Sequence, residues 1–298
     1  MSRLAVRAAA KVNLHLEVLG TRRDGFHELR TLLQSIDLAD ELSAERAADG
    51  ELELTVRPCT AAPRGDDNLV AAAARALWQA TGRRDGARLE LVKRIPTGAG
   101  LGGGSADAAA ALVLLDRLWR LELGPDSLLE LAAGIGSDVP FFLLGGLVLG
   151  VGRGAEVYPL PDLPPCGVVL VTPHVQVSTA EVYRRLDADG DWRAVDPTVY
   201  AYAAGVTGEV PWSRLRNDLE PVVAEGWPEV DEALARLRDL GESVRCAVTG
   251  SGSAVFALFE RPGLATAAAE SLTGGWRVHV GRTLARERAR LVVEEIPA

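Results

Sequence analysis

Alternation of apolar and polar residues marks short strands along the chain. Residues 11–19 alternate strictly, which predicts a strand with one buried face and one polar face. The buried face carries Val12, Leu14, Leu16 and Val18, and the polar face carries Lys11, Asn13, His15 and Glu17. Similar patterns predict strands at 51–56, 89–95, 167–171, 244–248, 255–259 and 276–280, whereas 29–36 fits a strand and a helix equally well.

Helical periodicity and end signals predict helices at 67–80, 105–121, 127–134, 229–240 and 264–272. Asp67 or Asn68 can cap the first helix. Ser105 is suited to cap the second, with Asp107 in its first turn, where a negative charge complements the helix dipole. Residues 187–212 show no periodicity and contain Pro, Asp and Trp, so we expect them to be irregular.

These elements favour an α+β fold over a doubly wound sheet, because strands and helices mix without a regular βαβ rhythm. A chain of 298 residues is long enough for one large domain or two ordinary ones. We place a boundary near residue 155, which divides the chain into an N-terminal domain 1–155 and a C-terminal domain 156–298.

Composition narrows the class of protein. Hydrophobic residues make up 48% of the chain, and the net charge of -9 argues against a general nucleic-acid binder, which needs a basic face. The longest apolar run, 139–151, is interrupted by glycines and is too short to span a bilayer. The first ten residues are too short and too mixed for a signal peptide. We therefore expect a cytoplasmic protein without a membrane partner, as a monomer or a homodimer.

Cysteine and lysine are both rare. Cys59, Cys166 and Cys246 form no CxxC or Cys/His pattern, so we expect small apolar residues rather than disulfides or metal ligands. The chain has only two lysines, Lys11 and Lys93, and all its other Lys or Arg residues are arginine. Lys93 ends a predicted strand and is interpreted as a surface residue without a catalytic role.

The segment 96–105, Pro-Thr-Gly-Ala-Gly-Leu-Gly-Gly-Gly-Ser, places five glycines between a predicted strand and a predicted helix. Glycine loses the most backbone entropy on folding, so this density needs a reason. A backbone without side chains lets N–H groups approach an anion, and the free N–H groups at the start of the helix favour phosphate. The segment therefore predicts a phosphate cradle.

Three other interpretations of this loop are weaker. A flexible linker is typical between domains rather than between a strand and a capped helix. A Walker A loop requires a lysine that is absent here. The pattern GxGxxG is present, but the dinucleotide fingerprint also expects an acidic residue after a second strand, and Asp116 and Glu122 lie in or beside a predicted helix. An oxidoreductase is kept as an alternative.

Three blocks in order along the chain resemble the GHMP kinase superfamily. The loop 96–105 resembles its central phosphate-binding motif, 9–14 resembles its opening strand, and 249–254 resembles its third glycine motif. The resemblance implies a two-domain α+β fold with the active site in the interdomain cleft.

Within the superfamily, the chain is most similar to the branch that phosphorylates the 2-hydroxyl of 4-diphosphocytidyl-2-C-methyl-D-erythritol in non-mevalonate isoprenoid precursor biosynthesis. The similarity rests on residues 10–14, 23–29, 136–141 and 216–220, and more loosely on 173–179. That branch usually has Tyr where this chain has Phe26, which keeps a ring for stacking on cytosine but loses the hydroxyl.

The resemblance implies roles for individual residues. Lys11 and Asp138 would be catalytic. The acceptor would contact Asn13, Phe26, His27, His174 and Thr179. ATP, which brings Mg²⁺, would be bound by Pro96, Gly98, Gly100, Leu101, Gly102, Gly103, Gly104 and Ser105. Gly250, Ser251 and Gly252 would stiffen the cleft wall, and no separate metal site is expected.

Each role has a structural alternative. Asp138 could cap a helix, Lys11 could be an exposed strand lysine, and residues 250–252 could form a plain hairpin turn. Phe26 could be a core residue and His27 a solvated loop residue. A kinase of the superfamily for homoserine, a mevalonate-type substrate or a sugar is the main functional alternative, and a non-catalytic binding protein with the same fold is another.

Overall fold

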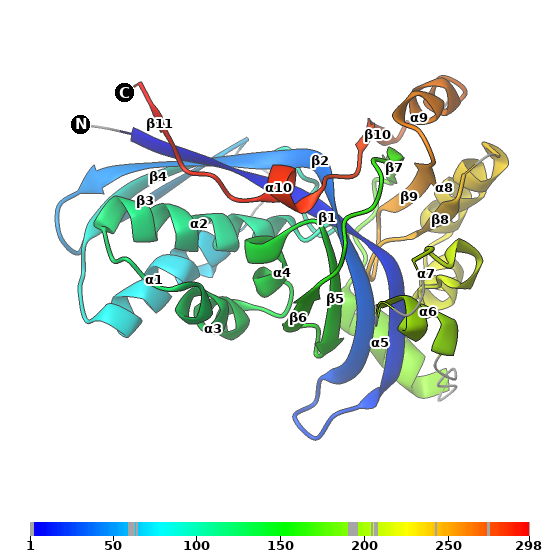
Figure 1. Cartoon of the computed structure of the whole chain (residues 1–298), viewed down its shortest axis with the longest axis horizontal. Helices are drawn as coiled ribbons and strands as arrows, with labels where there is room; N and C mark the ends of the chain where they lie inside the picture. The colour runs from blue at the N-terminus through cyan, green and yellow to red at the C-terminus, as the bar shows by residue number, and fades with distance from the viewer. Residues whose placement is uncertain are drawn as a thin grey trace.

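The computed structural model describes residues 3–58, 63, 65–189, 196–203, 205, 208–241, 243–272 and 275–297. They form two sheets that lie side by side (Figure 1). The first sheet has the strand order β11-β1-β2-β4-β3, with β5 on β2 and β6 on β5, and the second has the order β10-β7-β9-β8. The α+β prediction is confirmed.

The first sheet is built around a long antiparallel hairpin. Its strands are β1 (Arg3–Thr21), β2 (His27–Ala47), β3 (Leu52–Arg57), β4 (Gly86–Val92), β5 (Leu147–Gly152), β6 (Glu156–Pro159) and β11 (Glu294–Ile296). The segment 29–36, which fitted two interpretations, is strand within β2. Most pairs in this sheet are antiparallel, and only β3 and β4 run parallel among the described strands. This is not the doubly wound sheet that a dinucleotide fingerprint requires.

Helices cover one face of the first sheet (Figure 1). They are α1 (Leu69–Thr81), α2 (Gly103–Trp119), α3 (Pro125–Ile135) and α4 (Val139–Leu144), with the short helix η1 (Gly65–Asp67) before α1. The alanines of α2, Ala106 and Ala108–Ala111, are fully buried, because small side chains let this helix pack closely on β1 and β2.

The second sheet contains β7 (Gly167–Thr172), β8 (Arg245–Val248), β9 (Val255–Phe259) and β10 (Arg277–Arg282). Its surrounding helices are α5 (Thr179–Asp189), α6 (Pro197–Ala203), η2 (Trp212–Arg214), α7 (Glu220–Gly226), α8 (Pro228–Asp239) and α9 (Pro262–Ala269). The short helix α10 (Arg286–Ala289) lies instead against β2 of the first sheet (Figure 1). The prediction of irregular structure over 187–212 was therefore wrong where α5, α6 and η2 lie. Residues 190–195, 204, 206 and 207, like Cys59, lie outside the described residues.

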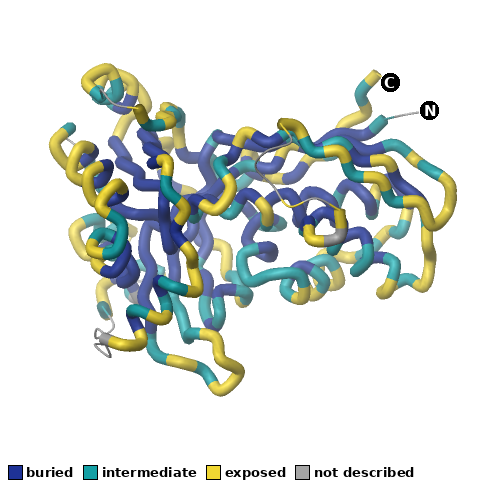
Figure 2. Tube along the Cα trace, turned by 180° about the vertical axis from the view of Figure 1, so that it is seen from behind, coloured by how far each residue is buried: buried dark blue, intermediate teal, exposed yellow. Residues whose placement is uncertain are grey.

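The two halves are joined by more than one crossing of the chain. The second sheet ends in β10, and the chain then returns through α10 to β11, which pairs with the start of β1. Figure 2 shows buried residues following the strands through the middle of the molecule, while the tip of the β1–β2 hairpin is exposed. Strands β6 and β11 follow residue 155 in the sequence but pair with the first sheet. The domain division near residue 155 stays a prediction.

Two predictions about helix ends and burial need correction. The cap of α2 is Gly102, and Ser105 lies inside the helix, because the left-handed glycine already starts the turn that Ser105 was expected to start. At α1 the cap is Asn68, whose side chain accepts a hydrogen bond from the Val70 N–H at 2.9 Å. The polar face of β1 is also buried, because the second half of the chain packs over it.

Candidate active site

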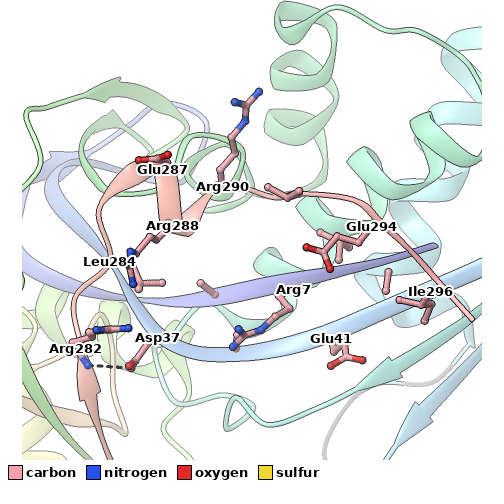
Figure 3. Close-up of a pocket in the computed structure, with 16 residues that line it drawn as sticks. Arg7, Asp37, Glu41, Arg282, Leu284, Glu287, Arg288, Arg290, Glu294 and Ile296 are labelled. Carbon is pink, nitrogen blue, oxygen red and sulfur yellow. Dashed lines mark hydrogen bonds between the residues drawn. The ribbon is translucent and has the colours of Figure 1, made fainter.

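Among the described residues, cavities large enough to hold a small molecule lie at three places. One of about 540 Å³ lies between the C-terminal segment and strands β1 and β2 (Figure 3), and none of the residues predicted for the site lines it. A second cavity of about 800 Å³, the shared cavity, is lined by residues of both halves, among them Lys11, Asp138 and Thr179. A smaller one of about 310 Å³ is lined by the whole glycine loop 96–105. The last two share Gly98, Gly100 and Gly102, so the glycine loop separates two adjoining spaces.

The glycine loop requires glycine at its narrowest points. Gly98, Gly100 and Gly102 all have positive φ angles, which side chains rarely adopt. A Cβ atom on Gly100 would lie 2.1 Å from the Thr249 carbonyl oxygen, and one on Gly102 would lie 2.6 Å from the Phe142 ring. The loop therefore runs against neighbouring backbone and leads directly into α2, as expected of a phosphate cradle.

Backbone contacts fix the loop between the two halves. The Lys11 N–H donates to the Leu101 carbonyl oxygen at 3.1 Å, and the Ala254 N–H donates to the Ala99 carbonyl oxygen at 3.1 Å. The turn at 249–252 thus lies against the loop from the other side. The three sequence blocks that resembled a kinase family meet at this place.

Lys11 and Asn13, which are buried, form a polar group beside the loop with Asp138, which is partly exposed to the cavity. The Lys11 ammonium lies 2.5 Å from the Asn13 side-chain oxygen and 3.6 Å from an Asp138 carboxylate oxygen. Asp138 stands at the start of α4 but makes no capping hydrogen bond with its side chain. Lys11 is almost fully buried, so the interpretation of an exposed lysine is wrong, whereas Asp138 does occupy the N-cap position of α4, with its side chain free of a capping bond.

Burial and charge act in opposite directions on Lys11. Loss of water around the ammonium lowers the pKa of Lys11 below its ordinary value, and the charge of Asp138 partly offsets this effect. The net effect is a lowered pKa of Lys11, because burial outweighs the attraction of the Asp138 carboxylate. A compact cation in this position can stabilise negative charge that develops nearby.

Two threonines that the sequence analysis did not single out orient Asn13. The Asn13 amide nitrogen donates to the Thr31 hydroxyl at 2.8 Å, and that hydroxyl donates to the His15 carbonyl oxygen at 2.7 Å. The Thr249 hydroxyl lies 3.2 Å from both the Asn13 side-chain oxygen and the Gly100 carbonyl oxygen. These bonds direct the Asn13 oxygen at Lys11.

Aromatic side chains gather at another part of the same cavity. The ring of His27 stacks on Tyr183 with a centroid distance of 4.4 Å, and His27 Nε2 lies 2.8 Å from an Asp187 oxygen. Phe26 is half exposed beside them. The sequence analysis missed Tyr183 and Asp187, because their contacts arise only when α5 folds against the β1–β2 hairpin.

The structure brings most predicted acceptor residues together, with one exception. Thr179 lines the cavity, and its hydroxyl lies 2.7 Å from that of Ser251, which joins α5 to the glycine turn. His174 instead donates to the Gly275 carbonyl oxygen at 2.6 Å and is not among the residues that line either space beside the glycine loop. The geometry gives a substrate role for His174 no support.

Lys93 is not a surface residue, contrary to the prediction. Its side chain is buried between Asp40 and Asp107, with the ammonium 2.6 Å from an Asp107 oxygen. Burial lowers its pKa, but the two carboxylates outweigh this and raise the pKa of Lys93 overall. Asp40 also accepts hydrogen bonds from the N–H groups of Arg94 and Ile95. This triad anchors the chain where it enters the glycine loop.

The described residues contain no group of three or more His, Cys, Asp or Glu side chains that could hold a metal ion. Asp138 faces the shared cavity, and Ser105 lines the smaller space beside the loop. Among the described helices, none combines the length and apolar character needed to cross a bilayer.

Two models of known protein families match parts of this chain. The model described as the GHMP kinases N terminal domain matches residues 68–146, and the model described as GHMP kinases C terminal matches 211–277. The first match contains the glycine loop and Asp138, and the second contains the turn at 249–252.

Individual relatives match over most of their length. A 4-diphosphocytidyl-2-C-methyl-D-erythritol kinase from Pelotomaculum thermopropionicum is 45% identical over 84% of this chain and 87% of that protein. The protein of the same name from Synechococcus sp. CC9311 is 46% identical over 85% of this chain and 86% of its own.

Solved structures agree with these matches. A crystal structure of 4-(cytidine 5'-diphospho)-2C-methyl-D-erythritol kinase superposes with a TM-score of 0.77 at 40% identity, covering 94% of this chain and 98% of that one. A homoserine kinase from Cytophaga hutchinsonii superposes with a TM-score of 0.74 at 21% identity over 99% of this chain and 97% of its own, which shows a shared fold.

Proposed function

Because this chain belongs to the GHMP kinases and, among them, to the 4-diphosphocytidyl-2-C-methyl-D-erythritol kinases, we propose that its shared cavity transfers the γ-phosphoryl group of ATP to the 2-hydroxyl of that acceptor. The reaction is a step of non-mevalonate isoprenoid precursor biosynthesis. The observation that carries the assignment of the site is the contact of Lys11 with Asp138 beside the glycine loop.

The transfer exchanges one oxygen–phosphorus bond for another. The acceptor oxygen forms a bond to the γ-phosphorus, the bond from that phosphorus to the bridging oxygen breaks, and ADP leaves. The hydroxyl proton passes to Asp138. A loose phosphoryl-transfer transition state needs little early removal of that proton, so an ordinary carboxylate is adequate.

The remaining groups bind and position the two substrates. The N–H groups of the glycine loop and the start of α2 hold the phosphates of ATP, and Mg²⁺ accompanies them. Lys11 stabilises charge that develops during transfer, and Asn13 orients Lys11 and the acceptor. Phe26 and Tyr183 offer ring faces for the cytosine, and His27 offers a polar edge.

These rings distinguish the proposal from its main alternative. A homoserine or mevalonate kinase acts on a small acceptor without a base, whereas this cavity carries Phe26, His27 and Tyr183 along its wall. Turnover of an acceptor panel with Mg-ATP tests the choice. We expect efficient phosphorylation of 4-diphosphocytidyl-2-C-methyl-D-erythritol, and efficient use of homoserine or mevalonate with no use of the cytidyl acceptor would contradict it.

A further inference from the structure

Arg153 differs from the other basic side chains of the shared cavity. The basic side chains that line this cavity are Lys11, His27, Arg153 and Arg184. Lys11 lies beside Asp138, and His27 lies beside Asp187. Arg184 donates two hydrogen bonds to Glu181, at 2.8 and 2.6 Å. In the part of the chain that the structure describes, Arg153 has no carboxylate partner.

The backbone presents Arg153 at the tip of a tight turn. Strands β5 and β6 are joined by residues 153–155, and Gly152 and Gly154 on either side of Arg153 have φ angles of 66° and 95°. Gly152 pairs with Leu29 of β2, which places the turn beside the β1–β2 hairpin that carries Phe26. The position of Arg153 is therefore set by sheet pairing rather than by a free loop.

Neutral groups hold the Arg153 guanidinium. One nitrogen donates to the Ala133 carbonyl oxygen at 2.7 Å, near the end of α3, where carbonyl groups lack helical partners. The guanidinium carbon lies 5.4 Å from the centre of the Phe26 ring. This contact aligns the cation without neutralising it, and the bond to Ala133 uses one of five N–H donors.

The acceptor carries a charge that fits this cation. Its diphosphate joins the cytidine to the methylerythritol, so a base held near Phe26 and a hydroxyl held near Asp138 require the diphosphate to lie between them. Two phosphates in a cleft need cationic donors, and a guanidinium supplies several in a fixed plane. The other basic side chains of the cavity wall already face carboxylates.

We propose that Arg153 binds the diphosphate of the acceptor and makes the cleft selective for a nucleoside diphosphate-linked polyol. The proposal rests on the function proposed above. It assigns to Arg153 a role in specificity, because an acceptor without the diphosphate would leave this cation unused.

Calorimetric titration with cytidine 5'-diphosphate and with cytidine tests the proposal without turnover. We expect the wild-type protein to bind the diphosphate about tenfold more tightly than the nucleoside, the size expected of charge-assisted hydrogen bonds. Arg153→Met keeps the apolar stem and removes the charge, so this ratio should collapse while the affinity for cytidine stays. Arg153→Lys should retain part of the ratio.

Arg184→Met is the matched control, because Arg184 lines the same cavity but is already paired with Glu181. It should leave the ratio unchanged. An unchanged ratio in Arg153→Met, or an equal loss of affinity for both ligands, would overturn the proposal, since the second result would mean that Arg153 only supports Phe26. Unchanged cytidine binding also shows that the variant is folded, and Arg153→Gln provides a second neutral variant.

Steady-state kinetics separates this proposal from the proposed function. Arg153→Met should raise the KM for the cytidyl acceptor about tenfold and leave the KM for ATP unchanged. A rise in the KM for ATP alone would overturn the role of Arg153. Absence of turnover by the wild-type protein would contradict the proposed function. The ratio of the affinities for cytidine 5'-diphosphate and cytidine, compared between the wild-type protein and Arg153→Met, would still decide the role of Arg153.

Discussion

The ammonium group of Lys11 lies 3.6 Å from a carboxylate oxygen of Asp138, and the two side chains reach this contact from different elements. Lys11 belongs to β1 and is almost fully buried, whereas Asp138 stands at the start of α4 and is partly exposed to the cavity. The pKa of Lys11 therefore depends on the charge of the Asp138 carboxylate. In the proposed reaction, this pair links proton transfer to charge stabilisation.

This link can be observed directly, because the chain has only two lysines. In protein labelled with ¹⁵N-lysine, the Nζ signal of Lys11 should titrate below the ordinary pKa of 10.5 and that of Lys93 above it. Asp138→Asn should lower the pKa of Lys11 further, because it removes the charge that opposes desolvation. Lys11→Met assigns the signals, and two signals titrating together at the ordinary value would contradict the account.

The same shift sets the alkaline limit of activity. A lysine that loses its proton no longer stabilises developing charge, so kcat should fall as the pH rises through a value below 10.5. A pH profile of kcat at saturating substrates checks this. An activity that stays constant to the ordinary lysine value would mean that the charge of Lys11 is not required.

Lys93 is expected to be structural. Removing it in Lys93→Met leaves Asp40 and Asp107 buried without their cation, which should cost about 3–5 kcal/mol of unfolding free energy. The neighbouring variant Arg94→Met is the control, because its ion pair with Glu41 is exposed and should contribute less than about 1 kcal/mol. Urea unfolding measures both, and equal small losses would show that the triad does not anchor the loop.

Asp107 should make stability depend on pH. Burial raises its pKa from 3.8 to about 7, so the folded state binds more protons than the unfolded state between these values. Its contribution to stability is therefore complete below pH 3.8 and is lost as the pH rises through about 7. Relative to Asp107→Asn, the wild-type protein should lose unfolding free energy over this range. Parallel stability profiles of the two proteins would contradict the assignment.

Local sequence was sufficient to predict the parts of the candidate site that depend on backbone conformation. The phosphate cradle at the glycine loop and the common strand face of Lys11 and Asn13 were predicted because each signal lies within a few residues, whereas the roles of Lys11 and Asn13 came from the resemblance to a family. Placing Asp138 in the site required the resemblance to a family, since an aspartate before Val139 and Pro140 carries no local sign of catalysis. The structure places Lys11, Asn13 and Asp138 around one cavity with Gly98, Gly100 and Gly102 of the loop.

Contacts between distant segments were not predictable in the same way. Thr31 reaches Asn13 through the register of β2 on β1, and Tyr183 reaches His27 through the docking of α5, so neither leaves a local pattern. Lys93 was predicted wrongly although a signal existed. In a chain that otherwise uses arginine, a lysine indicates a position where a compact ammonium fits, and between Asp40 and Asp107 it does.

The most direct measurement follows the products of the reaction by mass. The purified protein is incubated with Mg-ATP and 4-diphosphocytidyl-2-C-methyl-D-erythritol, beside Asp138→Asn, whose fold is checked by circular dichroism. The account predicts ADP and an acceptor heavier by one phosphoryl group from the wild-type protein, and loss of most of this product from Asp138→Asn. Wild-type turnover by the folded variant would contradict the role of Asp138, and no product from a wild-type protein that binds ATP would contradict the proposed acceptor.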